Sequence, residues 1–182
     1  VFDIIMHSDW GTSYNAYLVK GSEKTALFET SKLEFFDEFL ANVREVFDPA
    51  SIDYIVVDHT EPDHSGSLEK LLALAPNATV LGSATALNFL KQIVNHEFAC
   101  RAVTEKDTVD LGGMTLHFLS VPFLHWPDSM YTYIPEAKAL FTCDSFGCHY
   151  ADSRVFNDLI EGDFTPAYKY YFDCIIGPFK RP

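Results

Sequence analysis

The chain has few cysteines and few basic residues, and both shortages exclude classes of protein. Its 4 cysteines among 182 residues form no CxxC pair and are too sparse for a secreted disulfide scaffold. We therefore expect a reducing cytoplasm as the location. The 13 basic residues stand against 26 acidic ones, which gives a net charge of -13. Because nucleic-acid binding needs clustered Lys and Arg, we expect no nucleic-acid partner.

Long apolar segments and nucleotide-binding loops are also missing from the sequence. No uninterrupted apolar run is long enough to cross a bilayer and no signal peptide is visible, so we expect no membrane association. The GxGxxG and Walker-type loops that cradle phosphate groups are absent. The sequence therefore shows no flavin or nucleotide site.

The composition and the order of elements predict one packed domain over residues 1–182. A hydrophobic content of 48% and an aromatic content of 15% are typical of a globular protein. Apolar periodicity predicts strands at 13–19, 24–30, 52–58, 78–82, 108–121 (two strands), 129–135 and 139–144. It predicts helices at 31–47, 68–75, 83–94, 152–160 and 166–176. This order favours an α/β fold with one mixed sheet or two packed sheets covered by helices.

The segment HTEPDHSGSL, residues 59–68, follows a predicted buried strand and is the most informative stretch. Turns are commonly polar, and Pro62, Ser65 and Gly66 already supply the turn chemistry. The turn does not require four further polar side chains, and each of these can bind a metal: His59, Glu61, Asp63 and His64. A loop at the end of a buried strand is where functional residues usually lie.

The spacing within this loop suits two metal ions. In an extended segment His59 and Glu61 project to the same side, and Pro62 favours the extended form at Glu61. Beyond the proline, Asp63 and His64 diverge from them in direction. One loop can therefore form the shared floor of a two-metal site.

Two more candidate ligands follow later strands. His125 lies in LHWPDSM (124–130) and Asp144 in TCDSFG (142–147), each at the end of a predicted strand. Strand ends on one scaffold can direct such side chains at a common point. Cys143, next to Asp144, is interpreted as a small buried hydrophobe, not as a thiolate ligand.

These motifs together resemble the metallo-β-lactamase-like domain of flavodiiron proteins, and the resemblance spans essentially the whole chain. It implies an αββα sandwich of two mixed sheets flanked by helices. It also implies that His59, Glu61 and His125 hold one iron ion, that Asp63 and His64 hold a second, and that Asp144 bridges the two. The same resemblance implies reduction of O₂ to water, of NO to N₂O, or of both.

Glu61 separates this interpretation from a zinc hydrolase of the same fold. Hydrolytic relatives carry His-x-His-x-Asp-His, whereas here a carboxylate replaces the second histidine. Zinc sites favour nitrogen and sulfur donors, while mixed carboxylate and imidazole donors suit iron. A zinc hydrolase and a di-iron O₂ sensor or carrier without a flavin remain the alternatives.

The resemblance also implies parts that the sequence does not show. The family supplies a further histidine to the second iron, but no histidine follows His149, so we expect a chain truncated at the C-terminus; His149 is a weak substitute. Continued turnover requires an electron source. In the family this is FMN on a C-terminal flavodoxin-like domain, reduced by a rubredoxin-like donor within a head-to-tail homodimer.

Overall fold

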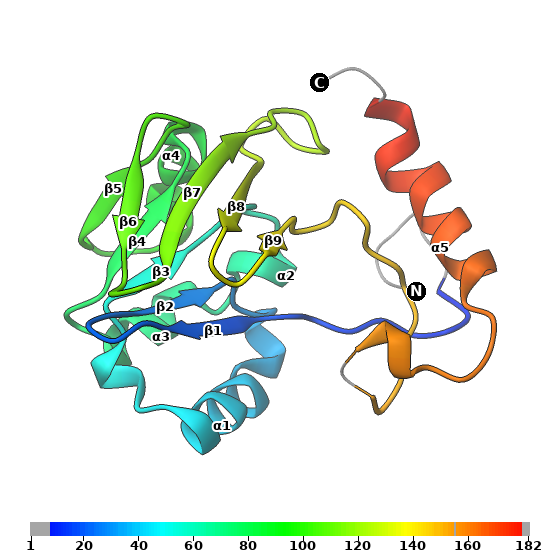
Figure 1. The fold of residues 1–182 in the computed structure, drawn as a ribbon, viewed down its shortest axis with the longest axis horizontal. Helices are drawn as coiled ribbons and strands as arrows, with labels where there is room; N and C mark the ends of the chain where they lie inside the picture. Colours follow the sequence, from blue (N-terminus) through cyan, green and yellow to red (C-terminus); the bar gives the residue numbers. More distant parts are fainter. Residues whose placement is uncertain (1–7, 155, 180–182) are drawn as a thin grey trace.

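The computed structural model describes residues 8–154 and 156–179, which form two sheets packed face to face (Figure 1). The first sheet has the order β1-β2-β3-β4-β5 and comprises Tyr17–Lys20, Thr25–Phe28, Tyr54–Val56, Thr79–Gly82 and Cys100–Ala102. The second has the order β6-β7-β8-β9 and comprises Thr108–Asp110, Thr115–Ser120, Met130–Ile134 and Ala139–Phe141.

Strand direction follows from the connections. The short turn between β1 and β2 makes an antiparallel pair, whereas helical crossovers make β2, β3 and β4 parallel. β5 also runs parallel to β4. The second sheet is antiparallel throughout.

The main helices are α1 (Phe36–Val46), α2 (Pro62–Ser65), α3 (Leu68–Leu74), α4 (Ala84–Ile93) and α5 (Thr165–Tyr171). Short 3-10 turns span Leu33–Phe35, Pro49–Ser51, Asn157–Leu159 and Gly177–Phe179, and a π-helical turn spans Phe172–Ile176. The Ser83 hydroxyl accepts a hydrogen bond from the Ala86 N–H at 3.0 Å and caps α4, as its sequence position predicts. No helix in the described ranges is both long and apolar enough to cross a membrane.

The central strands of the first sheet, β2, β3 and β4, are largely buried on both faces, and their sequences are almost continuously apolar. Leu27, Ile55 and Val80 pack against α1, α3 and α4 in one core cluster. Their neighbours Phe28 and Val56 point the opposite way, into a second cluster between the two sheets. This packing fixes the end of β3, and therefore the start of the loop at 59–68, between two rigid layers.

The predicted sandwich of two sheets with flanking helices is confirmed, with differences in detail. The second sheet is antiparallel, not mixed, because hairpins and loops without helices connect its strands. The helix predicted at 152–160 is wrong: among the residues of that segment that the structure describes, Asn157–Leu159 forms a 3-10 turn and no α-helix is present. Strand β5 was not predicted, because three residues carry too little periodicity to detect. Figure 1 shows α2 beside β9, at the edge of the sheets that faces α5.

Candidate metal centre

A proline divides the loop after β3 into two parts with different geometry. His59 is fully buried, and Glu61 adopts extended backbone angles with φ -57° and ψ 147°. Pro62 then begins α2, which carries Asp63 and His64. A proline disfavours helical geometry in the preceding residue and favours a helix start at its own position. The four polar side chains therefore leave the loop in two pairs, as the spacing predicts.

His125 and Asp144 lie in the loops that follow β7 and β9, a few residues beyond the strand ends. The Asp144 turn closes through hydrogen bonds from Ser145 N–H to Thr142 O at 3.0 Å and from Gly147 N–H to Asp144 O at 2.9 Å. Cys143 has a positive φ of 42° in this turn. Backbones in this sparsely populated region cluster at functional sites.

The first group of donor atoms comprises His59, Glu61, His125 and Asp144, with one atom of each residue lying within 4.8 Å of the others. Glu61 Oε2 lies 3.3 Å from His59 Nε2 and 3.4 Å from His125 Nε2. Asp144 Oδ2 lies 3.0 Å from His125 Nε2 and 3.5 Å from His59 Nε2. Two imidazoles and two carboxylates thus face a common point.

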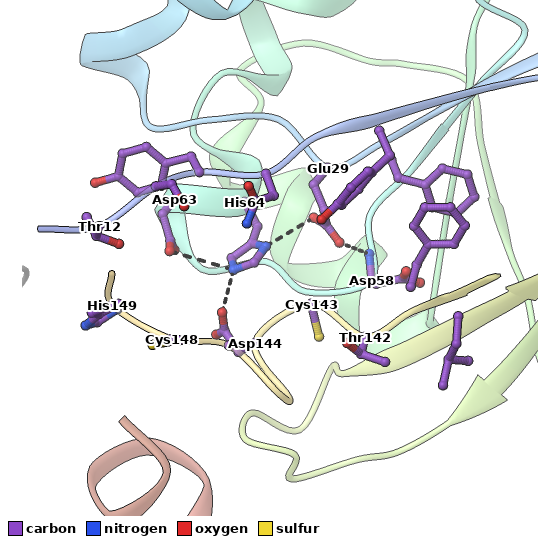
Figure 2. A pocket seen from close by; sticks show the side chains of 18 of the residues that line it. Thr12, Glu29, Asp58, Asp63, His64, Thr142, Cys143, Asp144, Cys148 and His149 are labelled. Carbon is purple, nitrogen blue, oxygen red and sulfur yellow. Dashed lines mark hydrogen bonds and ion pairs between the residues drawn. The ribbon is translucent and has the colours of Figure 1, made fainter. Parts of the chain in front are cut away.

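The second group comprises Asp63, His64 and again Asp144. His64 Nε2 lies 2.9 Å from Asp144 Oδ1 and 3.7 Å from Asp63 Oδ2 (Figure 2). Asp144 therefore presents Oδ1 to one group and Oδ2 to the other. The structure brings all six predicted side chains together, in two groups that share Asp144.

Two buried carboxylates that sequence reasoning missed face the outer nitrogens of the histidines. Asp128 Oδ2 lies 3.3 Å from His59 Nδ1, and Glu29 Oε2 lies 3.6 Å from His64 Nδ1. An outward-facing Nδ1 leaves Nε2 for a metal, which is the arrangement that metal-binding histidines usually have. The only signal for Asp128 is its position in HWPDS, and Glu29 gives none because it reads as a strand residue.

Trp126 packs edge-on against both histidines of the first group. Its ring centroid lies 5.1 Å from that of His59, at 89°, and 6.2 Å from that of His125, at 70°. This packing restricts the orientation of the two imidazoles.

The pKa values of the metal-free site reflect mutual pairing. Burial opposes the charge on His59, but hydrogen bonds to Asp128 and Glu61 raise its pKa to about 9. Burial favours the neutral form of Glu61, but hydrogen bonds from His125 and His59 lower its pKa to about 2. Without a metal, protons on the histidines therefore balance the carboxylates, and metal loading has to displace them.

We expect the metal-free chain to lose stability as the pH rises from 6.5 towards 9. The pKa of His59 is raised from 6.5 to about 9 in the folded chain, so the protonated ring stabilises the fold fully below pH 6.5. This contribution, roughly 3 kcal/mol for His59 alone, is lost as the pH passes the folded pKa. Urea unfolding at pH 6.5 and pH 9 measures it. The metal-loaded chain is the control, because a bound metal keeps the ring unprotonated; an equal loss in both forms would contradict the pairing.

A cavity of about 420 Å³ lies beside the second group. Asp63, His64 and Asp144 line it, together with His149 and Tyr171. The His149 ring packs edge-on against Tyr171, with centroids 4.8 Å apart, and in the described part of the chain it belongs to neither donor group. The weak suggestion that His149 replaces a missing ligand therefore gains no support. Cys143 is half-buried, and desolvation of its thiol raises its pKa well above the usual value and keeps it protonated.

The donor set fits a pair of iron ions. It consists of imidazole nitrogens and carboxylate oxygens without a thiolate. Among the described residues, Glu61, Asp63 and Asp144 have histidines but no Lys or Arg as ion-pair partners. Three carboxylates gathered without a fixed cation require either protons or metal ions to balance them.

Comparison with known proteins identifies the family of the chain. Residues 12–173 match the sequence family described as "ODP family beta lactamase". The flavo-diiron protein FprA2 of Clostridium acetobutylicum is 48% identical over 99% of this chain. The chain belongs to the flavodiiron family. The type A flavoprotein fprA of Rhodobacter capsulatus is 43% identical over 98% of the chain.

Solved flavodiiron structures share the fold. The flavodiiron protein of Giardia intestinalis has a TM-score of 0.90 at 36% identity and covers 95% of the chain. The rubredoxin oxygen:oxidoreductase of Desulfovibrio gigas has a TM-score of 0.89 at 35% identity and covers 94%. The chain spans less than half of these proteins, namely 46% of FprA2, 42% of fprA, 42% of the Giardia protein and 43% of the Desulfovibrio protein.

Proposed function

We propose that this flavodiiron domain holds two iron ions and reduces O₂ to water, NO to N₂O, or both. His59, Glu61 and His125 hold the first ion, Asp63 and His64 hold the second, and Asp144 bridges them. The division of the two Asp144 oxygens between the donor groups supports this most directly. A shared carboxylate reduces the repulsion between two cations that lie ~3.5–4 Å apart in such sites.

Two ferrous ions, when bound, supply two electrons to a small ligand. The protein positions the donor groups and determines how a small ligand reaches them. Buried His59, packed against Trp126, closes the first group, whereas the second group has three donors and borders the cavity. A volume of about 420 Å³ is ample for O₂ or NO. Asp63 and His64 therefore mark the side from which we expect the gas to arrive.

The activity of the whole protein requires parts beyond this domain, and we propose them from the family. FMN on a flavodoxin-like domain passes electrons to the irons, a rubredoxin-like protein reduces the flavin, and two chains assemble head to tail in the cytoplasm. The name of the Desulfovibrio relative, a rubredoxin oxygen:oxidoreductase, supports such a donor.

Single-turnover chemistry tests the proposal without a flavin. The chain is loaded with Fe²⁺ under anaerobic conditions and exposed to NO, and N₂O is measured by gas chromatography. Two NO, two electrons and two protons give N₂O and water, so we expect one N₂O per iron pair. A chain that retains zinc in preference to iron, or that consumes no NO, would contradict the proposal.

A further inference from the structure

We propose that Glu29 is a positioning residue that sets the orientation and tautomer of His64, and through it the occupancy of the second metal position alone. The proposal rests on the proposed function, since it concerns one half of the same site. It predicts that the two positions can be separated by changing an acidic residue that touches neither metal.

The backbone around Glu29 holds His64 from one side. Glu29 follows β2 with a positive φ of 60°, and its N–H donates to Val56 O at 2.9 Å. The N–H and the hydroxyl of Thr30 both donate to His64 O, each at 2.7 Å. A non-glycine residue with this φ costs free energy that the surrounding contacts must offset. The turn at Glu29 and Thr30 therefore fixes the His64 backbone and turns the Glu29 side chain inward.

The Glu29 side chain faces the His64 ring from the other side (Figure 2). Its Oε1 accepts a hydrogen bond from the Asp58 N–H at 2.9 Å. Its Oε2 lies 3.6 Å from His64 Nδ1 and, among the described residues, has no hydrogen-bond partner. Glu29 is 5% exposed, so water does not readily donate a hydrogen bond to Oε2 in its place. A small rotation of the ring makes Nδ1–H the missing donor and leaves the Nε2 lone pair towards Asp63 and Asp144.

Glu29 has to accept from two N–H donors, one on each oxygen, and only a carboxylate can do this. An amide has one oxygen acceptor and one NH₂ donor. In Glu29→Gln either the Asp58 N–H or the His64 Nδ1–H then faces another donor. The Asp58 N–H is a fixed backbone group, so we expect the His64 ring to move its proton to Nε2 instead. That tautomer cannot bind a metal through Nε2.

Asp128 offers a comparison with Glu29, because a single oxygen, Oδ2, makes the contacts with His59 and Thr60. Asp128 Oδ2 lies 3.3 Å from His59 Nδ1 and accepts from both the N–H and the hydroxyl of Thr60, each at 2.8 Å. Asp128 Oδ1 has no hydrogen-bond partner among the described residues. In Asp128→Asn the amide oxygen keeps all three contacts and the NH₂ replaces Oδ1. The same change from acid to amide should therefore disturb His59 much less than His64.

Anaerobic Fe²⁺ titration of the full chain, with bound iron measured by equilibrium dialysis, tests the inference. We expect two ions per parent chain. Glu29→Gln should keep the affinity of the first ion and weaken the second about 10- to 100-fold, the usual cost of losing an outer partner of a metal ligand. Glu29→Asp keeps two acceptor oxygens and should bind the second ion more tightly than Glu29→Gln. Asp128→Asn should lose less affinity, at the first position only.

The other outcomes are equally decisive. Two ions with parental affinity in Glu29→Gln would overturn the positioning role while leaving the proposed function intact. Equal loss of both ions in Glu29→Gln and Glu29→Asp would show a general structural role and would also overturn it. If Glu29→Gln fails to fold, Glu29→Asp decides, because selective weakening of one ion supports the inference and parental binding contradicts it. A parent chain without an iron pair would overturn the proposed function itself.

Discussion

Replacing Asp144 with alanine is expected to empty both metal positions, not one. Its Oδ2 lies 3.0 Å from His125 Nε2 in the first group, and its Oδ1 lies 2.9 Å from His64 Nε2 in the second. Each ion therefore loses a direct ligand, and the repulsion between the ions is no longer screened. Loss of a group that hydrogen-bonds to a metal ligand costs at most roughly 100-fold in metal affinity. We expect a larger fall at both positions here, because a direct ligand is lost.

Iron content after anaerobic loading and desalting measures the effect of Asp144→Ala, and Asp107→Ala is a matched control. Asp107 is a half-buried aspartate that accepts hydrogen bonds from Thr104 in a turn and belongs to neither donor group of the described residues. The control should hold two ions per chain, and Asp144→Ala should hold well under one. If Asp144→Ala loses one ion and keeps the other at parental affinity, the proposed bridging role of Asp144 is contradicted.

Replacing Glu61 with histidine is expected to change which metal the chain prefers. Glu61 Oε2 lies within 3.4 Å of both imidazoles of the first group, so the replacement leaves three imidazoles and the shared Asp144 at that position. This nitrogen-rich set is typical of zinc, whereas the parent set with two carboxylates suits iron. We expect the ratio of bound zinc to bound iron to rise by about tenfold or more, and N₂O formation from NO to fall to background.

Loading with equal concentrations of Fe²⁺ and Zn²⁺, followed by elemental analysis, gives that ratio. Glu61→Asp is the matched control because it keeps the carboxylate one methylene shorter, and its metal ratio should stay near that of the parent. Hydrolysis of a thioester or lactam substrate that appears only in Glu61→His would strengthen the assignment. A zinc-to-iron ratio in Glu61→His that equals that of the parent chain would contradict it.

The inner residues of the site were predictable because local sequence determines their directions. Pro62 alone separates the extended Glu61 from the helical Asp63 and His64, and proline acts through its own ring and its immediate neighbour. The strand ends before His125 and Asp144 were recognisable from apolar runs. Their convergence is a consequence of two packed sheets. The spacing supplied the two pairs within the loop, and the resemblance assigned His125 and Asp144 to them.

The outer residues were not predictable, because tertiary contacts alone give them their role. Glu29 directly follows the apolar strand β2 and meets His64, which lies in α2 beyond the end of the neighbouring strand β3. Asp128 reaches His59 from a loop far along the chain. The segment 152–160 was mispredicted for a related reason: its apolar side chains Phe156 and Leu159 are exposed, at 63% and 53%, and do not pack as a helix face would. A periodic pattern without a surface to pack on does not determine a helix.

Anomalous diffraction at the iron edge, from crystals of the chain loaded with Fe²⁺, tests the account most directly. The account predicts two iron peaks about 3.5–4 Å apart, with one Asp144 oxygen on each and the Glu61 carboxylate on the ion shared with His59 and His125. A single peak, or a Glu61 carboxylate directed away from both imidazoles, would contradict it.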